Sequence, residues 1–262
     1  MTYTVAVANQ KGGVAKTTTV VSLGGALAGH EQDVLVVDLD AQANLTLALG
    51  VDPTKLHSSI SNVLLNSATI TSVSRESPIP GMDLVPSTAE MELAERFLPI
   101  RQDYEQILAH ALNGPLSSRA YDYVILDCPP SMGAVTLNAL NAADLLIIPT
   151  QPEYFSAHAL RGMMGAIRRV RRQYNPRLVY RILITIHDRR NRIHRNLTEQ
   201  IRNTFETGVF ETQIDIDTKL RESSVAGLPI TSYRSQSRSA LQYTALAEEL
   251  MRYAEEKAAE PA

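Results

Sequence analysis

The 262-residue chain contains a single cysteine, Cys128, so no disulfide can form within it. A lone cysteine fits a reducing cytoplasm, where free thiols are usually small packed residues. It also excludes an iron–sulfur protein in which each subunit must supply two cluster cysteines. We therefore expect Cys128 to be buried and chemically inert.

Long apolar segments are missing as well. No run approaches the roughly 18 apolar residues that a membrane span needs, and no basic stretch precedes the apolar segment at the N-terminus. We therefore expect neither a membrane anchor nor a secretory signal. The sequence also lacks internal repeats and a serine or cysteine triad pattern, and His187 and His194 do not have the i, i+4 spacing of a helical metal pair.

The hydrophobic content of 44% is enough for one large core, so we expect residues 1–262 to form a single domain with an unstructured tail at about 259–262. Charge is divided unevenly along this chain. Residues 161–202 contain twelve arginines, no lysine and two acidic residues, whereas the remainder carries 13 basic and 26 acidic residues. Such segregation favours an anionic partner for one face of the protein.

Apolar runs of strand length alternate with segments of helical period. Strands are predicted over residues 4–8, 34–37, 82–85, 124–126, 145–148 and 178–186, and helices over 17–28, 60–65, 89–97, 104–112, 158–174, 197–205 and 239–258. This alternation predicts an α/β fold with a mostly parallel twisted sheet flanked by helices on both faces. Ligands of such folds bind at the carboxyl ends of the strands.

The segment NQKGGVAKTTT, residues 9–19, connects the first predicted strand to the first predicted helix. It departs from the common phosphate loop, G-x-x-x-x-G-K-[ST]. With the lysine of that pattern placed on Lys16, Gln10 and Ala15 occupy the two glycine positions, and Lys11 is an additional lysine. The segment is therefore either a degenerate phosphate loop or a loop of another kind.

Its chemistry nevertheless suits a phosphate group. Consecutive backbone N–H groups of residues 12–17 at a helix N-terminus make an anion site. Gly12 and Gly13 allow the backbone to approach phosphates closely. Lys16 is placed to reach the β- and γ-phosphates and the Thr17 hydroxyl to bind Mg²⁺. The alternative is a plain glycine-rich turn between strand and helix. The acidic residues at the ends of neighbouring strands favour the nucleotide site over that alternative.

Three aspartates follow predicted strands. Asp127 closes Val-Ile-Leu-Asp and is suited to hold Mg²⁺ through a water. Asp38 and Asp40 are two residues apart and would share a face of an extended chain. We expect Asp38 to support the metal and Asp40 to orient or deprotonate the water that attacks the γ-phosphate. A plain loop carboxylate is the alternative for Asp40.

Several motifs carry a family resemblance: Lys-Gly-Gly-Val-Ala-Lys-Thr-Thr, Val-Val-Asp-Leu-Asp-Ala-Gln-Ala-Asn-Leu-Thr, Val-Ile-Leu-Asp-Cys-Pro-Pro-Ser, Leu-Asn-Ala-Leu-Asn-Ala-Ala-Asp and Gly-Leu-Pro-Ile. Together, over about residues 3–255, they resemble the ParA/Soj partition ATPases. The motif set is typical of the deviant Walker A class of phosphate-loop NTPases, which also includes MinD-type proteins and the nitrogenase iron protein.

The resemblance implies a role for Lys11. In this family two subunits sandwich two ATP molecules, and the signature lysine crosses to the phosphates of the partner, much as an arginine finger acts in trans. The resemblance implies that Lys11, Lys16 and Asp40 are catalytic and that Thr17 and Asp127, together with the supporting Asp38, serve the metal. The expected nucleotide contacts are Lys11, Gly12, Gly13, Val14, Ala15, Lys16, Thr17, Thr18 and Asp217, with Gly12 where the subunits meet and Thr18 at the α-phosphate.

The chain departs from the family pattern at three places. Ala15 stands where the family usually has glycine. Asp215-Ile216-Asp217 replaces the usual Pro-Arg-Asn, and Ser223-Ser224 replaces the usual Ala-Pro. The first departure, at Ala15, is expected to affect the rate of ATP hydrolysis or of dimer closure by slowing it. The others bear on the base contacts, for which we expect the Asp217 carboxylate to accept a hydrogen bond from the adenine amine.

Arginines recur on one face of the predicted helix at 158–174, where Arg161, Arg168 and Arg172 are spaced i, i+7 and i+11. A solvated face is the usual meaning of such a pattern, but arginine density without lysine favours phosphate binding. The family resemblance implies nonspecific binding of duplex DNA, and we expect its contacts to be Arg168, Arg172, Arg190, Arg192, Lys219 and Arg221.

The resemblance implies a cytoplasmic, nucleoid-associated ATPase. Its ATP-bound homodimer would bind duplex DNA nonspecifically, and a ParB-like partner would stimulate hydrolysis and release. Family members with a helix-turn-helix domain carry it before the first strand, on which this chain begins, so we expect no operator binding.

Alternative functions stay open. A MinD-like membrane regulator would end in a basic amphipathic helix, whereas this chain ends in an acidic segment. A related ATPase could position another cargo, since the adaptor decides the cargo. A DNA-coating protein with an inactive nucleotide site is the remaining option.

Overall fold

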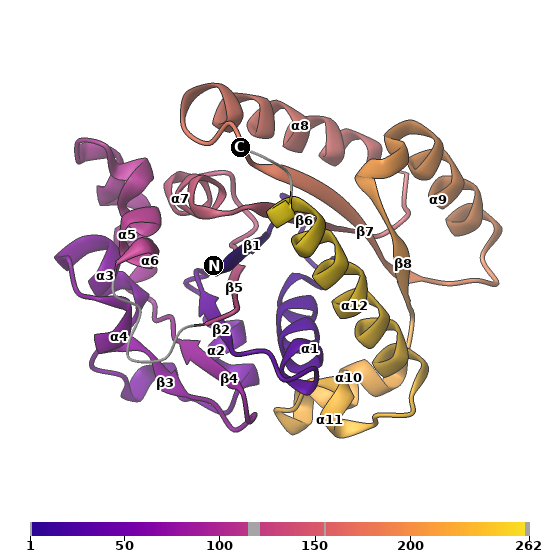
Figure 1. Ribbon diagram of the computed structural model, residues 1–262, viewed down its shortest axis with the longest axis horizontal. Coiled ribbons are helices and arrows are strands. Elements are labelled where there is room, and N and C mark those ends of the chain that lie inside the picture. Colours follow the sequence, from indigo (N-terminus) through magenta and orange to yellow (C-terminus); the bar gives the residue numbers. More distant parts are fainter. Residues whose placement is uncertain (1, 115–120, 155, 260–262) are drawn as a thin grey trace.

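The computed structural model describes residues 2–114, 121–154 and 156–259. Within them, eight strands form one sheet in the order β3-β4-β2-β5-β1-β6-β7-β8 (Figure 1). Neighbouring strands are parallel except for β3 and β4. The strands are β1 (Tyr3–Val7), β2 (Val34–Asp38), β3 (Arg75–Glu76), β4 (Met82–Val85), β5 (Tyr123–Asp127), β6 (Leu145–Thr150), β7 (Val179–His187) and β8 (Val209–Asp215).

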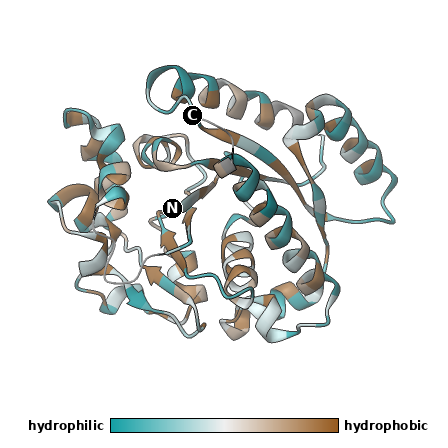
Figure 2. Cartoon of the chain, viewed as in Figure 1, coloured by the Kyte–Doolittle hydropathy of each residue, from teal (hydrophilic) through white to brown (hydrophobic). Residues whose placement is uncertain are grey.

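The central strands are apolar throughout because both faces of the sheet are covered. Along β2, Leu35 and Val37 pack into one core while Val34 and Val36 pack into the other, as the two-residue period of a strand requires. In Figure 2 the inner strands are largely brown, teal segments appear in the strands toward the edge, and the helices outside them show both colours. The core therefore consists of two apolar layers separated by the sheet.

Helices cover both faces. One layer contains α1 (Lys16–Gly29), α2 (Asn44–Ala48), α10 (Thr218–Ala226), α11 (Ile230–Tyr233) and α12 (Arg238–Ala259). The other contains α3 (Ile60–Asn66), α4 (Ile70–Val73), α5 (Met91–Phe97), α6 (Ile107–Asn113), α7 (Ala134–Ala142), α8 (Ser156–Gln173) and α9 (Arg192–Phe205). Short 3₁₀ turns are η1 (Pro53–Lys55), η2 (Leu98–Ile100), η3 (Tyr104–Gln106) and η4 (Glu206–Gly208). None of the described helices has the length and apolar character that crossing a bilayer requires.

The predicted α/β fold with helices on both faces is confirmed. Strand β8 was not predicted, because its sequence VFETQID is largely polar, as befits a strand at the edge of the sheet. Strand β3 and helices α2, α4, α7, α10 and α11 were also missed, and α9 begins at Arg192 rather than at residue 197. The tail expected at 259–262 lies outside the described residues except for Ala259, which ends α12.

The register of the sheet places the expected site residues side by side. Val7 of β1 lies opposite Asp127 of β5, and Asp127 lies opposite Asp38 of β2. Both aspartates point to the face that carries α1, because they alternate with residues of the opposite core. The carboxyl edge of three adjacent strands thus carries the loop and both carboxylates.

Candidate functional site

The loop between β1 and α1 contains two left-handed residues. Gly13 has φ +72°, and Ala15, which precedes α1, has φ 67° and ψ 36°. A side chain added at Gly12 or Gly13 would meet no atom of the described residues within 4 Å, which leaves open space in front of this loop. In the part of the chain that the structure describes, no side chain caps the N-terminus of α1, so its first N–H groups remain available to an anion.

Lys16 begins α1 directly behind this open space. Its Nζ donates to the backbone carbonyl of Lys11 at 3.3 Å, which directs the ammonium group toward the loop. Burial lowers the pKa of Lys16, and the nearby carboxylates of Asp127 and Asp40 oppose that shift. A desolvated ammonium group beside free N–H donors is suited to a phosphate oxygen.

Asp127 carries an unsatisfied acceptor. Its Oδ2 accepts the Thr17 hydroxyl at 2.7 Å. Its Oδ1 is buried, and the described residues provide no donor for it. Burial, and next the carboxylate of Asp38, raise the pKa of Asp127 well above the usual range. A buried carboxylate oxygen without a donor, beside a threonine hydroxyl and an open phosphate loop, fits the oxygen-rich surroundings that Mg²⁺ prefers.

Asp38 and Asp40 are two residues apart, but their carboxylates make different contacts. Asp38 is fully buried, and its oxygens accept from the Thr46 hydroxyl at 2.7 Å, the Thr46 N–H at 2.8 Å and the Asp40 N–H at 3.1 Å. Burial raises its pKa to about 6. These contacts hold the loop that follows β2, so any support from Asp38 to a metal is indirect.

Asp40 lies in that loop and is partly exposed. Its Oδ1 accepts from the Gln42 N–H at 2.9 Å, and its carbonyl accepts from the Ser87 hydroxyl at 2.7 Å. The Ser87 N–H in turn donates to the Thr46 hydroxyl at 2.9 Å. The chain of contacts fixes the backbone of Asp40 while its carboxylate stays accessible, which suits a group that acts on a water.

Lys11 lies on the other side of the loop. Its N–H donates to Asn9 Oδ1 at 3.0 Å, and the Asn9 amide donates to the Pro149 carbonyl at 2.7 Å. Its ammonium group forms an ion pair with Glu153, in the turn after β6. The lysine that the resemblance assigns to a partner's phosphates is therefore paired within its own subunit here.

A cavity of about 350 Å³ opens beside the N-terminal turn of α1. Its size falls in the range of small-molecule sites. Helices α1, α2 and α10 form its walls, with lining residues Thr17, Thr18, Val21, Ser22, Asn44, Leu47, Ala48, Ser223, Ser224 and Leu228. It brings Thr18 together with the serine pair that departs from the family pattern.

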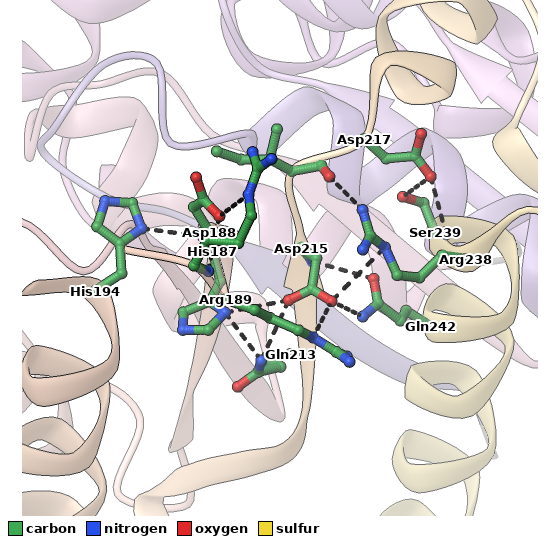
Figure 3. Close-up of polar contacts among 12 residues, drawn as sticks. His187, Asp188, Arg189, His194, Gln213, Asp215, Asp217, Arg238, Ser239 and Gln242 are labelled. Carbon is green, nitrogen blue, oxygen red and sulfur yellow. Dashed lines mark hydrogen bonds and ion pairs between the residues drawn. The ribbon is translucent and has the colours of Figure 1, made fainter. Parts of the chain in front are cut away.

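Asp217 lies near that wall as the N-cap of α10 (Figure 3). Its Oδ1 accepts from the Lys219 N–H at 2.9 Å, and its Oδ2 accepts from the Ser239 hydroxyl at 2.9 Å. Burial, the largest influence, would raise the pKa of Asp217, but these hydrogen bonds and Arg238 together lower it. The carboxylate therefore joins α10 to α12, and its expected contact with adenine stays a prediction.

The loop after β7 is attached to the edge of the sheet by a buried carboxylate (Figure 3). Asp215 is 2% exposed and pairs with His187 Nδ1 at 3.1 Å, Gln242 Nε2 at 2.8 Å and Arg189 Nε at 2.7 Å. The Asp188 N–H also donates to His194 Nδ1 at 3.1 Å. This network fixes the backbone from which Arg190 and Arg192 extend.

The structure divides the six expected DNA contacts between two ends of the sheet. Arg168 and Arg172 lie in the second half of α8, which leads to the start of β7, while Arg190 and Arg192 follow the end of β7. The strand between them, β7, has nine residues and is about 30 Å long.

Lys219 and Arg221 belong to α10, which follows β8 at the carboxyl edge of the sheet. Arg221 is exposed, whereas Lys219 Nζ is paired with Glu222 at 2.8 Å. The expected DNA contacts that share the carboxyl edge are thus Arg190, Arg192, Lys219 and Arg221.

Comparisons with known proteins show the family to which the chain belongs. A family model described as an AAA domain (AAA_31) matches residues 2–180. Chromosome partitioning protein ParA of Caulobacter vibrioides is 34% identical, covering 94% of this chain and 92% of that protein. Sporulation initiation inhibitor protein Soj of Bacillus subtilis is 35% identical, covering 94% and 97%. The chain belongs to the ParA/Soj family of ATPases.

A solved structure with a ParA/Soj-like fold carries ligands. Cobyrinic acid a,c-diamide synthase from Mycobacterium smegmatis, with a bound ATP analogue and magnesium, is 35% identical to this chain and superimposes with a TM-score of 0.86. The match covers 97% of this chain and 95% of that one. The similarity supports the presence of a nucleotide site in this fold.

Sequence reasoning missed several residues of the site. Asn9, Thr46, Ser87 and Glu153 hold its loops, and Asn44 lines the cavity. Asn44 and Thr46 lie just beyond Asp40, and a polar cluster after a buried strand could have drawn attention to them. Glu153 lies 142 residues from Lys11, and no local pattern connects the two.

Proposed function

We propose that this protein is an ATP-driven partition switch that hydrolyses ATP to ADP and phosphate. The observation that carries the proposal is the buried Asp127 carboxylate, which has one oxygen on the Thr17 hydroxyl while the other receives no donor from the described residues. This arrangement lies beside the glycine loop at Gly12 and Gly13 and the N-terminus of α1, which no described side chain caps.

Each residue of the site has a definite task in this proposal. The N–H groups of residues 12–17 and the Lys16 ammonium bind the β- and γ-phosphates. Thr17 and Asp127 hold Mg²⁺, which when bound neutralises phosphate charge. Asp40 orients a water toward the γ-phosphate and accepts its proton. The base and ribose lie in the cavity bordered by Thr18 and Ser224.

The switch acts through a dimer. Two ATP-bound subunits meet at Gly12, and Lys11 of each reaches the phosphates of the other. The dimer binds duplex DNA without sequence preference through arginines at the carboxyl edge, among them Arg190 and Arg192, which are both exposed. A ParB-like partner stimulates hydrolysis, and the subunits then leave the DNA. A cargo other than a chromosome or plasmid would use the same cycle with another adaptor.

The similarity to a diamide synthase favours a second candidate, an ATP-dependent amide ligase. A ligase that draws ammonia from glutamine through a cysteine nucleophile needs an accessible thiolate. Cys128 is the only cysteine in the chain and is 1% exposed, and burial raises the pKa of its thiol. The available thiol is therefore unsuited to that step.

A MinD-like membrane regulator is also disfavoured. Its C-terminal helix would need a free apolar face to lie on lipid. In α12 the apolar residues Tyr243, Leu246, Ala247 and Leu250 are fully buried against the sheet and α1.

The proposal is tested by the ATPase rate, measured alone, with duplex DNA and with DNA plus a ParB-type partner. We expect slow turnover that rises in each step. Asp40→Ala should lower the stimulated rate by about 10²–10⁴-fold, as loss of a general base does, while ATP binding persists. Equal rates under all conditions would contradict the switch, and amide formation from a carboxylate substrate would favour the ligase.

A further inference from the structure

The ion pair between Lys11 and Glu153 joins two loops at the carboxyl edge of the sheet. Lys11 follows β1 and Glu153 follows β6, and these strands are parallel neighbours. Both side chains are partly exposed, at 29% for Lys11 and 43% for Glu153. The contact is therefore accessible from outside and can open without disturbing the core.

The backbone on both sides of the pair is fixed. Lys11 is held by Asn9, which is 3% exposed and attached to the Pro149 carbonyl at the end of β6. The turn at Glu153 is closed by its N–H, which donates to the Gln151 carbonyl at 2.8 Å. The Ser156 hydroxyl also accepts from the Glu153 N–H at 3.2 Å. The two side chains can therefore change partners while the described backbone around them stays in place.

We infer that Glu153 is a positioning residue that holds Lys11 within its own subunit until an ATP-bound dimer closes. The inference rests on the proposed function, in which Lys11 crosses to the partner's phosphates. Lys11 cannot reach a second subunit while its ammonium group is paired with Glu153. Its four-carbon stem lets the ammonium group swing away from a fixed backbone.

Charge explains why closure would require the triphosphate. Glu153 offers the ammonium group one negative charge, partly screened by solvent. The phosphates of ATP offer several charges in a site from which dimer closure excludes water, where ionic interactions strengthen. ADP lacks the γ-phosphate and competes less well. Glu153 thus raises the protein concentration that dimer closure requires, and it makes closure with ATP more favourable than closure with ADP.

The first test measures whether the ion pair between Lys11 and Glu153 protects Lys11 in the nucleotide-free protein. The acylation rate of Lys11 by acetic anhydride is followed by mass spectrometry, with the exposed Lys55 as internal reference. Glu153→Gln should raise the relative rate at Lys11 roughly two- to fivefold, the range expected for a partly exposed ion pair. Glu256→Gln makes the same change of charge on an exposed position of α12 and should leave the rate unchanged. Equal rates in all three proteins would overturn the inference.

The second test measures dimer formation by sedimentation velocity in the presence of a non-hydrolysable ATP analogue. Glu153→Gln should dimerise at a roughly two- to fivefold lower protein concentration than the wild type and Glu256→Gln. Faster acylation without easier dimerisation would overturn the restraining role. Glu153→Asp keeps the charge but shortens the side chain, and an intermediate result is expected from it even if the glutamine variant fails to fold. A wild-type protein that binds no ATP would contradict the proposed function alone, because acylation still decides whether the pair exists.

Discussion

Replacing Ala15 by glycine should stabilise the protein. Ala15 has φ 67° and ψ 36°, in the left-handed region, and it carries a Cβ that crowds its own carbonyl there. The conformation is enforced by its surroundings. The Ala15 carbonyl accepts from the Thr19 N–H at 2.9 Å to begin α1, and the preceding Val14 carbonyl accepts from the buried Thr185 hydroxyl at 3.0 Å.

The magnitude follows from two opposing effects. A left-handed conformation costs an alanine roughly 1–2 kcal/mol, which glycine does not incur. Glycine in turn makes the unfolded chain more flexible, which costs about 0.4–1 kcal/mol. The expected net gain is therefore about 0.8 kcal/mol in the free energy of unfolding. For a chain of this size that gain corresponds to roughly 2 °C in Tm.

The assay compares Ala15→Gly with Ala245→Gly in thermal and urea unfolding of the nucleotide-free protein. Ala245 is exposed in the middle of α12, where glycine should cost about 1 kcal/mol. The two variants should thus shift Tm in opposite directions. Equal destabilisation by both would refute the strain at Ala15. We also expect wild-type Ala15 to permit nucleotide binding, so ATP binding that appears only in Ala15→Gly would contradict that expectation.

Three further predictions concern other parts of the molecule. Changing Arg190 and Arg192 to alanine should weaken duplex DNA binding and reduce the slope of log K against log salt by about 2, with ATP binding intact; unchanged affinity in a mobility assay would refute this assignment. Cys128 should react with iodoacetamide at least roughly 100-fold more slowly in the native protein than in urea, and equal rates would contradict its burial. Glu95→Ala should lower Tm by about 2–4 °C relative to the exposed Glu92→Ala, because the Glu95 carboxylate caps two N–H groups at the start of α7; equal Tm values would rule out that cap.

The parts of the fold that could be predicted are those with a strong local pattern. The β2 strand could be predicted because burial on both faces requires a run of apolar residues. The loop before α1 could be predicted because its tight turn requires glycine. Strand β8 was missed because polar residues satisfy an edge strand whose stability comes from pairing with β7. Helix α10 was missed although its N-cap is local, since Asp217 accepts from the Lys219 N–H. Only the second contact of Asp217, with the distant Ser239 hydroxyl, depends on the tertiary structure.

The expected DNA surface shows the limit of helical spacing as a guide. Arg168 and Arg172 share one face of α8, as their spacing predicts. The same arginine-rich segment also contains Arg171, whose Nε donates to the Leu178 carbonyl at 2.6 Å, and Arg181, which lies 4.4 Å from the Tyr253 ring centroid. Charge count alone cannot distinguish arginines that support the fold from arginines that face a ligand.

The sequence by itself determined the chemistry of this protein: a glycine loop with two lysines, carboxylates at strand ends and an arginine-rich segment. Residue type and local spacing are enough for those features, since each can be recognised from a short stretch of the chain. Only the tertiary structure decided the left-handed backbone of Ala15, the unsatisfied oxygen of Asp127 and the pairing of Lys11 with Glu153. Backbone angles, burial and long-range contacts depend on how parallel strands align, and the sheet brings together residues that lie more than a hundred positions apart.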